Sequence, residues 1–310
     1  MTSKPRIKVT SRSFSRHPFL KKELETLFPN SVFNQDGPET GLPDLEHFLA
    51  DADALILGLE MMDRSLLGRL KNLKIIAKYG VGLDNVDLEA AVEYGIQVGW
   101  TGGVNKRSVS EQTLGFMLGL TRNLFRSGFQ LKTGSWDKQG GSQLTGKCVG
   151  IIGCGNIGTD LIHLLQPFAV KILINDVVDK QGVVDTYGIK QVPKDELLTE
   201  SDFVSLHVPL TDQTFHMVNE DFLRSMKPSS FLINTSRGSV IDQSSLKKFL
   251  QDGLIAGSAL DVFESEPPDD IEFLQLPNLM ITPHIGGNAE EAVLAMGRSA
   301  LKHIKNYFLV

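Results

Sequence analysis

The chain alternates short apolar runs with amphipathic segments from its start to about residue 98. Short apolar runs between polar segments are typical of buried parallel strands, and apolar residues three and four apart are typical of helices that cover a sheet. The alternation therefore predicts a parallel α/β domain. Its expected strands are residues 7–10, 31–33, 54–57, 74–77 and 96–98, and its expected helices are residues 18–27, 43–49, 65–70 and 86–94.

A second stretch of alternating apolar and amphipathic segments follows a long helix and a glycine-rich segment. We expect the helix at residues 106–124, and the polar residues 134–146 form a connecting arm. The strands expected after it suffice for a doubly wound sheet. They are residues 149–152, 171–175, 189–192, 203–207, 231–234, 255–260 and 279–281.

The first of these strands runs into a glycine-rich turn and then into a helix. Gly153, Gly155 and Gly158 form the pattern G-x-G-x-x-G, and Asn156 and Ile157 begin the helix. The first glycine permits a tight turn, the second lets the backbone approach a pyrophosphate, and the third lets helix and strand pack closely. The helix N-terminus offers N–H groups to phosphates. These five residues are the predicted phosphate-binding site of a dinucleotide.

An acidic residue at the end of the next strand supports this interpretation. Asp176 follows Gly158 by 18 residues, where an acid that binds the adenosine ribose belongs. Its carboxylate would accept hydrogen bonds from the ribose hydroxyls and repel a 2′-phosphate. No arginine follows in residues 177–179. We therefore expect the cofactor to be NAD and not NADP.

The last segment, residues 290–308, is expected to be a long amphipathic helix beyond the second sheet. Its apolar face needs a surface, and we expect the first domain to supply it. The predicted fold is α/β with two parallel-sheet domains and a cleft between them. Residues 1–101 plus 288–310 form a discontinuous, flavodoxin-like substrate domain, and residues 102–287 form a Rossmann NAD-binding domain. The glycine pairs at 102–103 and 286–287 are the expected hinges.

Composition narrows the class of protein. The 310 residues, 41% of them hydrophobic, allow two domains with cores of their own. A formal net charge of −6 argues against binding to nucleic acid or to an anionic membrane. The polar residues 1–6 contain no apolar signal region, and Cys148 and Cys154 lie in the buried strand and turn. We expect a cytoplasmic protein without disulfides or a metal site.

Three ionisable residues come just after predicted strands. They are Arg237, Glu266 and His284. Taken singly, each has an ordinary explanation: a surface arginine, part of a solvated acidic run, and a structural histidine. Because the carboxyl ends of parallel strands share one edge of the sheet, the three are expected to meet beside the nicotinamide. A guanidinium, a carboxylate and an imidazole are what the reduction of a keto acid requires.

The chain resembles the D-isomer-specific 2-hydroxyacid dehydrogenase family. The resemblance covers almost the whole length in the family's order. It rests on residues 79–85, 105–111, 153–158, 201–210, 234–238, 260–267 and 283–287.

This resemblance implies several further site residues. His207, Pro209 and Thr235 line the cofactor, and Asp261 lies near the nicotinamide amide. The amides of Val81 and Gly82 hold the substrate carboxylate.

It also implies the mechanism. Arg237 holds the substrate carboxylate and the 2-oxygen and stabilises charge on that oxygen. Glu266 accepts a hydrogen bond from His284 and favours its protonated form. His284 then gives a proton to the oxygen as hydride arrives from the nicotinamide.

We expect the substrate to be a small polar 2-hydroxyacid. Lys78 ends one strand just before the carboxylate-binding turn, and phosphoglycerate dehydrogenases of the family often have a cation there. This makes 3-phosphoglycerate the leading candidate and glyoxylate or hydroxypyruvate the second. A surface lysine is the ordinary alternative. Tyr79 and Trp100, the latter in a Trp-Thr-Gly-Gly segment where many members have Asn-Thr-Pro-Gly, could equally form a pocket for a less polar keto acid.

Two further expectations concern assembly and class. Members of the family are commonly homodimers joined through their nucleotide-binding domains, and the helix at 106–124 with the arm at 134–146 suits that use. The C-terminal-binding proteins, which are NAD-sensing corepressors, share the fold and these residues, so a binding protein is the alternative of another class.

Overall fold

The computed structural model describes residues 5–34 and 44–309 and divides the chain into two compact units. Unit 1 is Met1–Asn105 with Gly287–Val310, and unit 2 is Lys106–Gly286. The predicted boundaries after residues 101 and 287 lie within a few residues of these crossings. Pro43, the first residue of one expected helix, lies outside the described residues, and that helix, α3, spans Leu45–Leu49.

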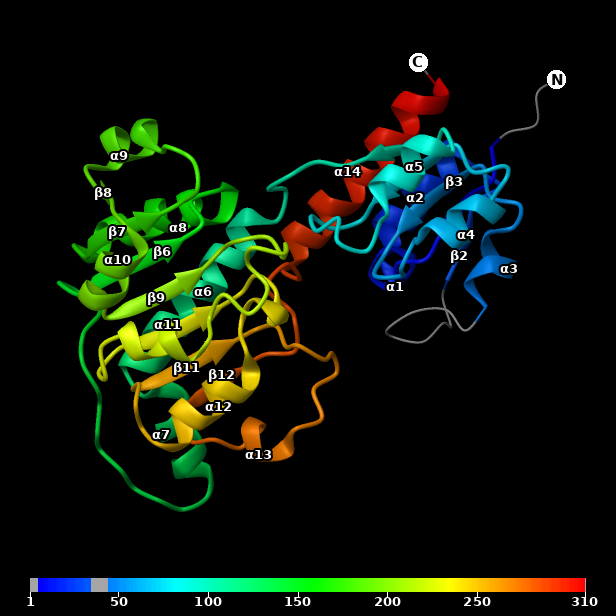
Figure 1. The fold of residues 1–310 in the computed structure, drawn as a ribbon. Helices are drawn as coiled ribbons and strands as arrows, with labels where there is room; N and C mark the ends of the chain where they lie inside the picture. The colour runs from blue at the N-terminus through cyan, green and yellow to red at the C-terminus, as the bar shows by residue number, and fades with distance from the viewer. Residues whose placement is uncertain (1–4, 35–43, 310) are drawn as a thin grey trace. The chain divides into compact units, whose positions relative to one another are not determined.

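Within the described part of unit 1, five strands form a parallel sheet in the order β2-β1-β3-β4-β5. This is the flavodoxin-like order, so the predicted fold class is confirmed. Strands β2 and β3 of this sheet are labelled in Figure 1. The strands are β1 (Ile7–Val9), β2 (Val32–Phe33), β3 (Ala54–Leu57), β4 (Ile75–Lys78) and β5 (Gln97–Gly99). The helices are α1 (Arg12–Arg16), α2 (Pro18–Leu27), α3, α4 (Arg64–Arg69), α5 (Leu88–Glu93) and α14 (Glu290–Leu309).

Side chains alternate between the two faces of this sheet, as strand geometry requires. Ile7, Ile56 and Ala77 lie in one buried cluster with side chains of α1, α2 and α14. Leu55 and Ile76 lie in another with side chains of α3, α4 and α5. The C-terminal helix therefore supplies part of the core of unit 1.

Residues 106–286 are all described, and in them seven strands form a parallel sheet in the order β12-β11-β10-β9-β6-β7-β8. The strands are β6 (Cys148–Ile152), β7 (Lys171–Asn175), β8 (Lys190–Gln191), β9 (Phe203–Leu206), β10 (Phe231–Asn234), β11 (Gly257–Leu260) and β12 (Leu279–Ile281). The chain turns back between β6 and β9, so the ends of these two neighbours form the switch point where open α/β sheets bind ligands.

Helices cover both faces of the second sheet. Buried side chains of α6 (Lys106–Thr121) and α8 (Asn156–Leu165) pack on one face. Those of α10 (Lys194–Glu200), α11 (Glu220–Ser225) and α12 (Gln243–Gln251) pack on the other. The remaining helices are α7 (Leu124–Lys132), α9 (Gln181–Tyr187), α13 (Ile271–Leu274) and the short 3-10 helices η1 (Gln166–Phe168) and η2 (Gly238–Val240). None of the helices in the described residues combines the length and apolarity needed to cross a bilayer.

The single helix predicted for residues 106–124 is wrong in its extent. It ends at Thr121, and a second helix, α7, begins at Leu124. Asn123 between them has φ +52°, a left-handed conformation that asparagine tolerates. Its side-chain Nδ2 donates to the carbonyl oxygen of Gln139 at 3.1 Å. The break thus depends on a contact with the arm, which helical periodicity does not reveal.

Candidate active site

The glycine turn joins the end of β6 to the start of α8. Gly153 has φ +91°, and a Cβ there would lie 2.5 Å from the carbonyl oxygen of His207. A Cβ at Gly158 would lie 2.4 Å from the carbonyl oxygen of Gly153. No side chain fits at either position, so the close packing of strand, turn and helix depends on both glycines.

Gly155 differs from these two because open space surrounds it. A Cβ there would meet no heavy atom within 4 Å, and Gly155 is the N-cap of α8 with no side-chain cap hydrogen bond. The first turn of α8 thus presents its backbone N–H groups, those of Asn156 and Ile157 among them, and the positive end of the helix dipole. This arrangement fits the pyrophosphate of a dinucleotide.

Asp176 lies at the end of β7, the strand next to β6. Its carboxylate accepts hydrogen bonds from the backbone N–H of Cys154 at 2.7 Å and of Val178 at 3.0 Å. The ammonium of Lys180 lies 3.6 Å from the same carboxylate. Sequence reasoning missed Lys180, because it considered only an arginine within residues 177–179, whereas Lys180 lies four positions after Asp176 and its side chain returns to the carboxylate.

His207 follows β9 at the switch point. Its Nε2 lies 2.9 Å from the hydroxyl of Ser205, and burial lowers the pKa of His207 to about 4. Within the described residues its Nδ1 is buried with no hydrogen-bond partner. A neutral imidazole with one unused ring nitrogen beside the glycine turn fits a lining for a bound cofactor.

Pro209 and Thr235 are also expected to line the cofactor, and they follow the neighbouring strands β9 and β10. The carbonyl oxygen of Pro209 accepts a hydrogen bond from the hydroxyl of Thr214 at 2.6 Å. Thr235, just after β10, is buried, and its hydroxyl lies 3.1 Å from that of Thr113 on α6. Both are therefore fixed in place by local hydrogen bonds.

The structure brings the three predicted catalytic residues to one edge of the sheet. Arg237 follows β10, Glu266 follows β11 and His284 follows β12, and these strands are neighbours. His284 Nδ1 lies 2.7 Å from Glu266 Oε2. The other carboxylate oxygen of Glu266 accepts the backbone N–H of Phe263 at 3.1 Å. The Arg237 guanidinium donates to the carbonyl oxygen of Ser236 at 2.7 Å.

Arg237, Glu266 and His284, the trio of predicted catalytic residues, affect the pKa values of Glu266 and His284. The hydrogen bond that His284 Nδ1–H donates to Glu266 raises the pKa of His284 above its ordinary value, although burial and the charge of Arg237 oppose it. Burial would raise the pKa of Glu266, but the hydrogen bond with His284, the charge of His284 and that of Arg237 hold it below the ordinary value. The pair therefore favours an imidazolium beside a carboxylate.

Gly238 brings the loops of Arg237 and Glu266 together. A Cβ at Gly238 would lie 1.9 Å from the backbone carbonyl carbon and oxygen of Phe263. Only glycine permits this approach between the segment after β10 and the segment after β11. The glycine thus sets the position of the guanidinium relative to the carboxylate.

Asp261 anchors the loop that carries His284. Its buried carboxylate accepts hydrogen bonds from two backbone N–H groups of that loop and from two side chains. The donors are Ile285 N at 2.8 Å, Gly286 N at 2.7 Å, Thr282 Oγ1 at 2.6 Å and Gln112 Nε2 at 2.8 Å. Sequence reasoning missed Gln112 and Thr282, because Gln112 lies 149 residues from Asp261 along the chain.

The expected substrate-binding residues Lys78, Val81 and Gly82 lie in unit 1. Lys78 is buried at the end of β4, and its ammonium donates to the carbonyl oxygen of Gly58 at 2.6 Å and to Oδ1 of Asn85 at 2.8 Å. Val81 and Gly82 lie in the partly exposed loop after β4. The carbonyl oxygen of Val81 accepts a hydrogen bond from Nε1 of Trp100 at 2.6 Å.

A group of residues with metal-ligand chemistry lies on the same unit as the trio. Among the described residues, His216, Asp242 and Glu264 place ligand atoms within 4.8 Å of one another. His216 Nε2 lies 2.8 Å from Glu264 Oε1, and Asp242 accepts hydrogen bonds from the first turn of α12. These groups satisfy one another and the helix end, which explains their clustering without an ion.

The family described as "D-isomer specific 2-hydroxyacid dehydrogenase, NAD binding domain" matches residues 114–286. The glyoxylate reductase of Thermococcus litoralis is 39% identical over 264 residues, which are 82% of this chain and 80% of that protein. The hydroxypyruvate reductase of Thermotoga maritima is 40% identical over 76% of this chain and 77% of that protein.

Two further relatives differ in named substrate. The D-3-phosphoglycerate dehydrogenase of Methanocaldococcus jannaschii is 38% identical over 86% of this chain, but the match covers only 52% of that protein. The solved structure of D-lactate dehydrogenase from Aquifex aeolicus, complexed with NAD and lactic acid, is 29% identical with a TM-score of 0.83, covering 97% of this chain and 95% of that one.

Proposed function

We propose that this chain, which belongs to the D-isomer-specific 2-hydroxyacid dehydrogenase family and is an NAD-dependent enzyme, acts on glyoxylate and hydroxypyruvate. The observation that carries the reaction type is the hydrogen bond of 2.7 Å between His284 and Glu266, next to the charge of Arg237. A protonated imidazole and a guanidinium at one sheet edge suit the reduction of a carbonyl group next to a carboxylate.

The chain's own residues supply binding, charge and a proton. Arg237 holds the substrate carboxylate and the 2-oxygen, and its positive charge stabilises the negative charge that develops on that oxygen. Glu266 occupies Nδ1 of His284, which leaves Nε2 to face the substrate. Nε2–H then gives its proton to the 2-oxygen, and a hydroxyl group forms.

The cofactor supplies the other half of the reaction: bound NADH provides the hydride that C2 accepts. Gly155 and the first turn of α8, where open space and uncapped N–H groups are found, would hold its pyrophosphate, and Asp176 would hold the adenosine ribose. In the oxidative direction neutral His284 accepts the hydroxyl proton. The amides of Val81 and Gly82 bind the substrate carboxylate.

The environment of Lys78 favours a substrate without phosphate. Its ammonium is buried and already donates to two oxygens, those of Gly58 and Asn85. These short hydrogen bonds direct the ammonium toward Gly58 and Asn85, and burial of the side chain opposes its approach to a substrate phosphate. We therefore place glyoxylate and hydroxypyruvate before 3-phosphoglycerate, which reverses the order suggested by the sequence. The relatives named glyoxylate reductase and hydroxypyruvate reductase, matched over most of their length, support the same order.

3-Phosphoglycerate remains the second candidate, because Lys78 directly precedes the carboxylate-binding loop and one relative is a D-3-phosphoglycerate dehydrogenase. The test compares NADH turnover with glyoxylate, hydroxypyruvate, phosphohydroxypyruvate and pyruvate, in wild type and in Lys78→Met. We expect the highest kcat/KM with glyoxylate or hydroxypyruvate. A phosphate preference in wild type that Lys78→Met abolishes would establish the second candidate. No turnover with any of the four acids would favour the alternative of another class, an NAD-sensing binding protein.

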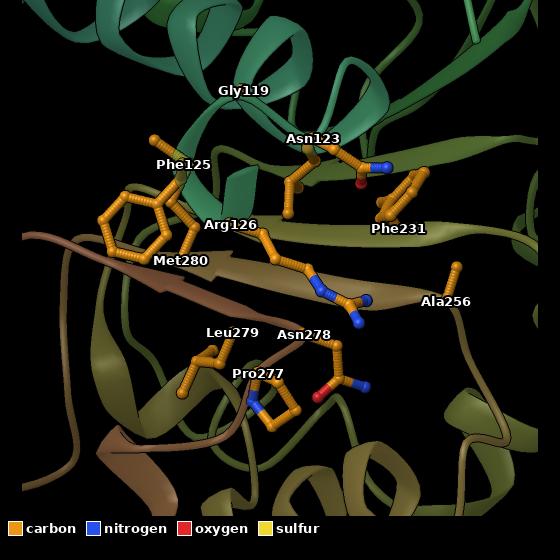
Figure 2. Close-up of a pocket in the computed structure, with 11 residues that line it drawn as sticks. Gly119, Asn123, Phe125, Arg126, Phe231, Ala256, Pro277, Asn278, Leu279 and Met280 are labelled. Carbon is orange, nitrogen blue, oxygen red and sulfur yellow. The ribbon is translucent and has the colours of Figure 1, made fainter. Parts of the chain in front are cut away.

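We also propose that the enzyme is a homodimer joined through unit 2. The support is the exposed apolar surface of α7 and the arm after it, formed by Leu124, Phe125, Phe129, Leu131 and Trp136. Such a patch is more typical of an interface than of a free surface. The patch adjoins the edge strand β12, where Phe125 lies beside Met280 and the side chain of Arg126 extends toward Asn278 (Figure 2).

The cavity drawn in Figure 2 is not the cofactor site. It has a volume of about 60 Å³ and is lined by residues of the α6–α7 junction, of β12 and the loop before it, and by Phe231 and Ala256. Sites for small organic ligands have volumes of roughly 300 Å³ or more, so this cavity is too small for a dinucleotide. We regard it as part of the proposed dimer surface.

The free, buried Cys148 and Cys154 suit a reducing cytoplasm as the place of the reaction.

A further inference from the structure

The indole of Trp100 is hydrogen-bonded to the loop after β4. Its Nε1 donates to the carbonyl oxygen of Val81 at 2.6 Å. The contact arises because β5 pairs with β4, with Gly99 opposite Ala77, so the segments that follow the two strands leave the same edge of the sheet. A residue 19 positions further along the chain thereby reaches the carboxylate-binding loop.

The bond fixes one particular peptide group. The carbonyl of Val81 and the N–H of Gly82 belong to the same planar unit, in which C=O and N–H point in opposite directions. When the oxygen is held by the indole, the N–H of Gly82 must point away from Trp100. Glycine permits a wide range of backbone angles, so this peptide would otherwise rotate easily.

Other bonds hold the two ends of the same loop. The N–H of Tyr79 donates to the carbonyl oxygen of Leu57 at 2.9 Å, and the carbonyl oxygen of Asn85 accepts the N–H of Met62 at 2.8 Å. These bonds determine where the loop begins and ends. The indole acts between them, on the orientation of its central peptide.

Trp100 is itself held in place by α14. The hydroxyl of Thr101 lies 2.9 Å from Nε2 of His303, and a Cβ at Gly99 would lie 2.6 Å from Cβ of His303. The residues on both sides of Trp100 are therefore fixed against the helix. The indole extends from this anchored segment and is 42% exposed.

We propose that Trp100 is a positioning residue for the substrate carboxylate. Its N–H holds the Val81–Gly82 peptide so that the N–H of Gly82 is directed at the carboxylate, and it polarises that amide into a stronger donor. The proposal rests on the function proposed above, in which this loop binds the carboxylate of the keto acid.

The test compares Trp100→Phe with Trp136→Phe. Both changes remove an indole N–H and keep an aromatic ring. Trp136 lies on the arm of unit 2, in the proposed dimer surface, and phenylalanine keeps that surface apolar. The carboxylate is bound in ground state and transition state alike, so Trp100→Phe should raise KM for glyoxylate about 5-fold to 10-fold with little change in kcat. The inhibition constant of oxamate, an unreactive analogue with the same carboxylate, should rise by the same factor. KM for NADH should stay unchanged, and Trp136→Phe should match wild type in all these values.

The outcomes separate this proposal from the proposed function. Wild type that reduces no keto acid contradicts the function. If wild type is active and the two variants have equal KM for glyoxylate and equal inhibition by oxamate, the role of Trp100 is overturned. A loss in Trp100→Phe that is confined to kcat overturns it as well. If Trp100→Phe does not fold, the fluorescence of Trp136→Phe gives the test. The chain has two tryptophans, so Trp100 is the sole indole of that variant. A change of its emission that saturates with oxamate supports the proposal, and unchanged emission under inhibiting oxamate overturns it.

Discussion

His284 combines an unusual backbone conformation with an ion pair. Its φ is +53°, in the left-handed region that non-glycine residues adopt at a cost of about 1–3 kcal/mol. Its backbone N–H donates to the carbonyl oxygens of Asp261 at 2.8 Å and Thr282 at 3.0 Å, which hold the strained conformation. The imidazole is thereby directed at Glu266, so the strain is part of how the proposed proton donor is positioned.

The pH dependence of the reaction follows from this pair. The proposed reduction uses protonated His284, so kcat/KM for the keto acid should fall as pH rises through the pKa of His284, which Glu266 raises. Glu266→Gln removes the negative charge and lowers that pKa, because the neutral amide no longer favours the imidazolium. The fall should then begin at lower pH, and the loss relative to wild type should be larger at pH 8 than at pH 6.

The measurement is the pH profile of kcat/KM in both directions. Oxidation needs neutral His284, so Glu266→Gln should shift its rise to lower pH as well. His284→Ala is the control, with a loss of roughly 100-fold to 10,000-fold and no corresponding limb in the profile. Identical profiles in wild type and Glu266→Gln would show that the carboxylate does not set the pKa of the proton donor.

The pair of Asp176 and Lys180 should determine the choice of cofactor. Asp176→Ala removes the acceptor for the ribose hydroxyls, so KM for NADH should rise about tenfold. In wild type the ammonium of Lys180 lies 3.6 Å from this carboxylate. The substitution removes that partner and leaves the ammonium available to a 2′-phosphate. Turnover of NADPH should therefore increase.

Steady-state kinetics with both cofactors would measure this change. The double variant Asp176→Ala with Lys180→Met should lose the gain with NADPH. Asp176→Asn, which keeps an acceptor for the N–H of Cys154, controls for damage to the glycine turn. Wild type that uses NADPH as well as NADH would contradict the assigned role of Asp176.

At the scale of elements, the arrangement of the proposed catalytic residues Arg237, Glu266 and His284 depends on the spacing of three neighbouring loops. Arg237 and Glu266 are carried by the segments after β10 and β11, which touch at Gly238. The third loop, after β12, is held by the buried carboxylate of Asp261. The sheet therefore supplies the order of the catalytic groups, and glycine and aspartate contacts between loops supply the distances.

Gly238→Ala should disturb this spacing. Its new Cβ would lie 1.9 Å from the carbonyl of Phe263, so the loops must separate. Overpacking of this kind costs about 1–3 kcal/mol of stability, and kcat/KM for the keto acid should fall at least about tenfold. KM for NADH should change less, because the glycine turn after β6 is not involved.

Gly182→Ala is the matched control, because Gly182 lies in α9 with no heavy atom within 4 Å of its Cβ position. Alanine there should stabilise the protein by about 0.5–1 kcal/mol and leave kinetics unchanged. Urea unfolding and steady-state kinetics on both variants give the comparison. Full activity in Gly238→Ala would show that the distance between the two loops is not critical.

At the scale of the whole molecule, the exposed apolar surface of α7 and the arm is the feature that unit 2 leaves unexplained. Phe129 is 65% exposed and Trp136 is 76% exposed. Exposure of several large apolar side chains on one short helix and the adjoining arm is costly in water. Burial against a second copy would remove that cost.

Sedimentation velocity at micromolar concentration should show a dimer in wild type and a monomer in Phe129→Glu, which places a charge in the proposed interface. Phe19→Glu is the matched control, because Phe19 is 66% exposed but lies on α2 of unit 1. It should remain a dimer. Wild type that sediments only as a monomer, or two variants that behave alike, would contradict the assembly proposed here.

Much of this protein was predictable from the sequence because the relevant signals are local. The periods of apolar residues indicated the strands of both sheets, and the glycine spacing with Asp176 indicated the dinucleotide-binding turn. The family and the fold class predicted in this way are confirmed. The meeting of Arg237, Glu266 and His284 could be predicted because parallel strands place their carboxyl ends at one edge of a sheet, and their catalytic roles stay a prediction.

The tertiary structure alone decided how these groups are held. Lys78 is engaged by Gly58 and Asn85, and Trp100 reaches Val81, through contacts between segments that the sequence does not pair. The anchor of the His284 loop joins Asp261 to Gln112, 149 residues away. The periodicity of a segment records which face it buries, whereas a hydrogen bond between distant residues exists only once the sheet has brought them together.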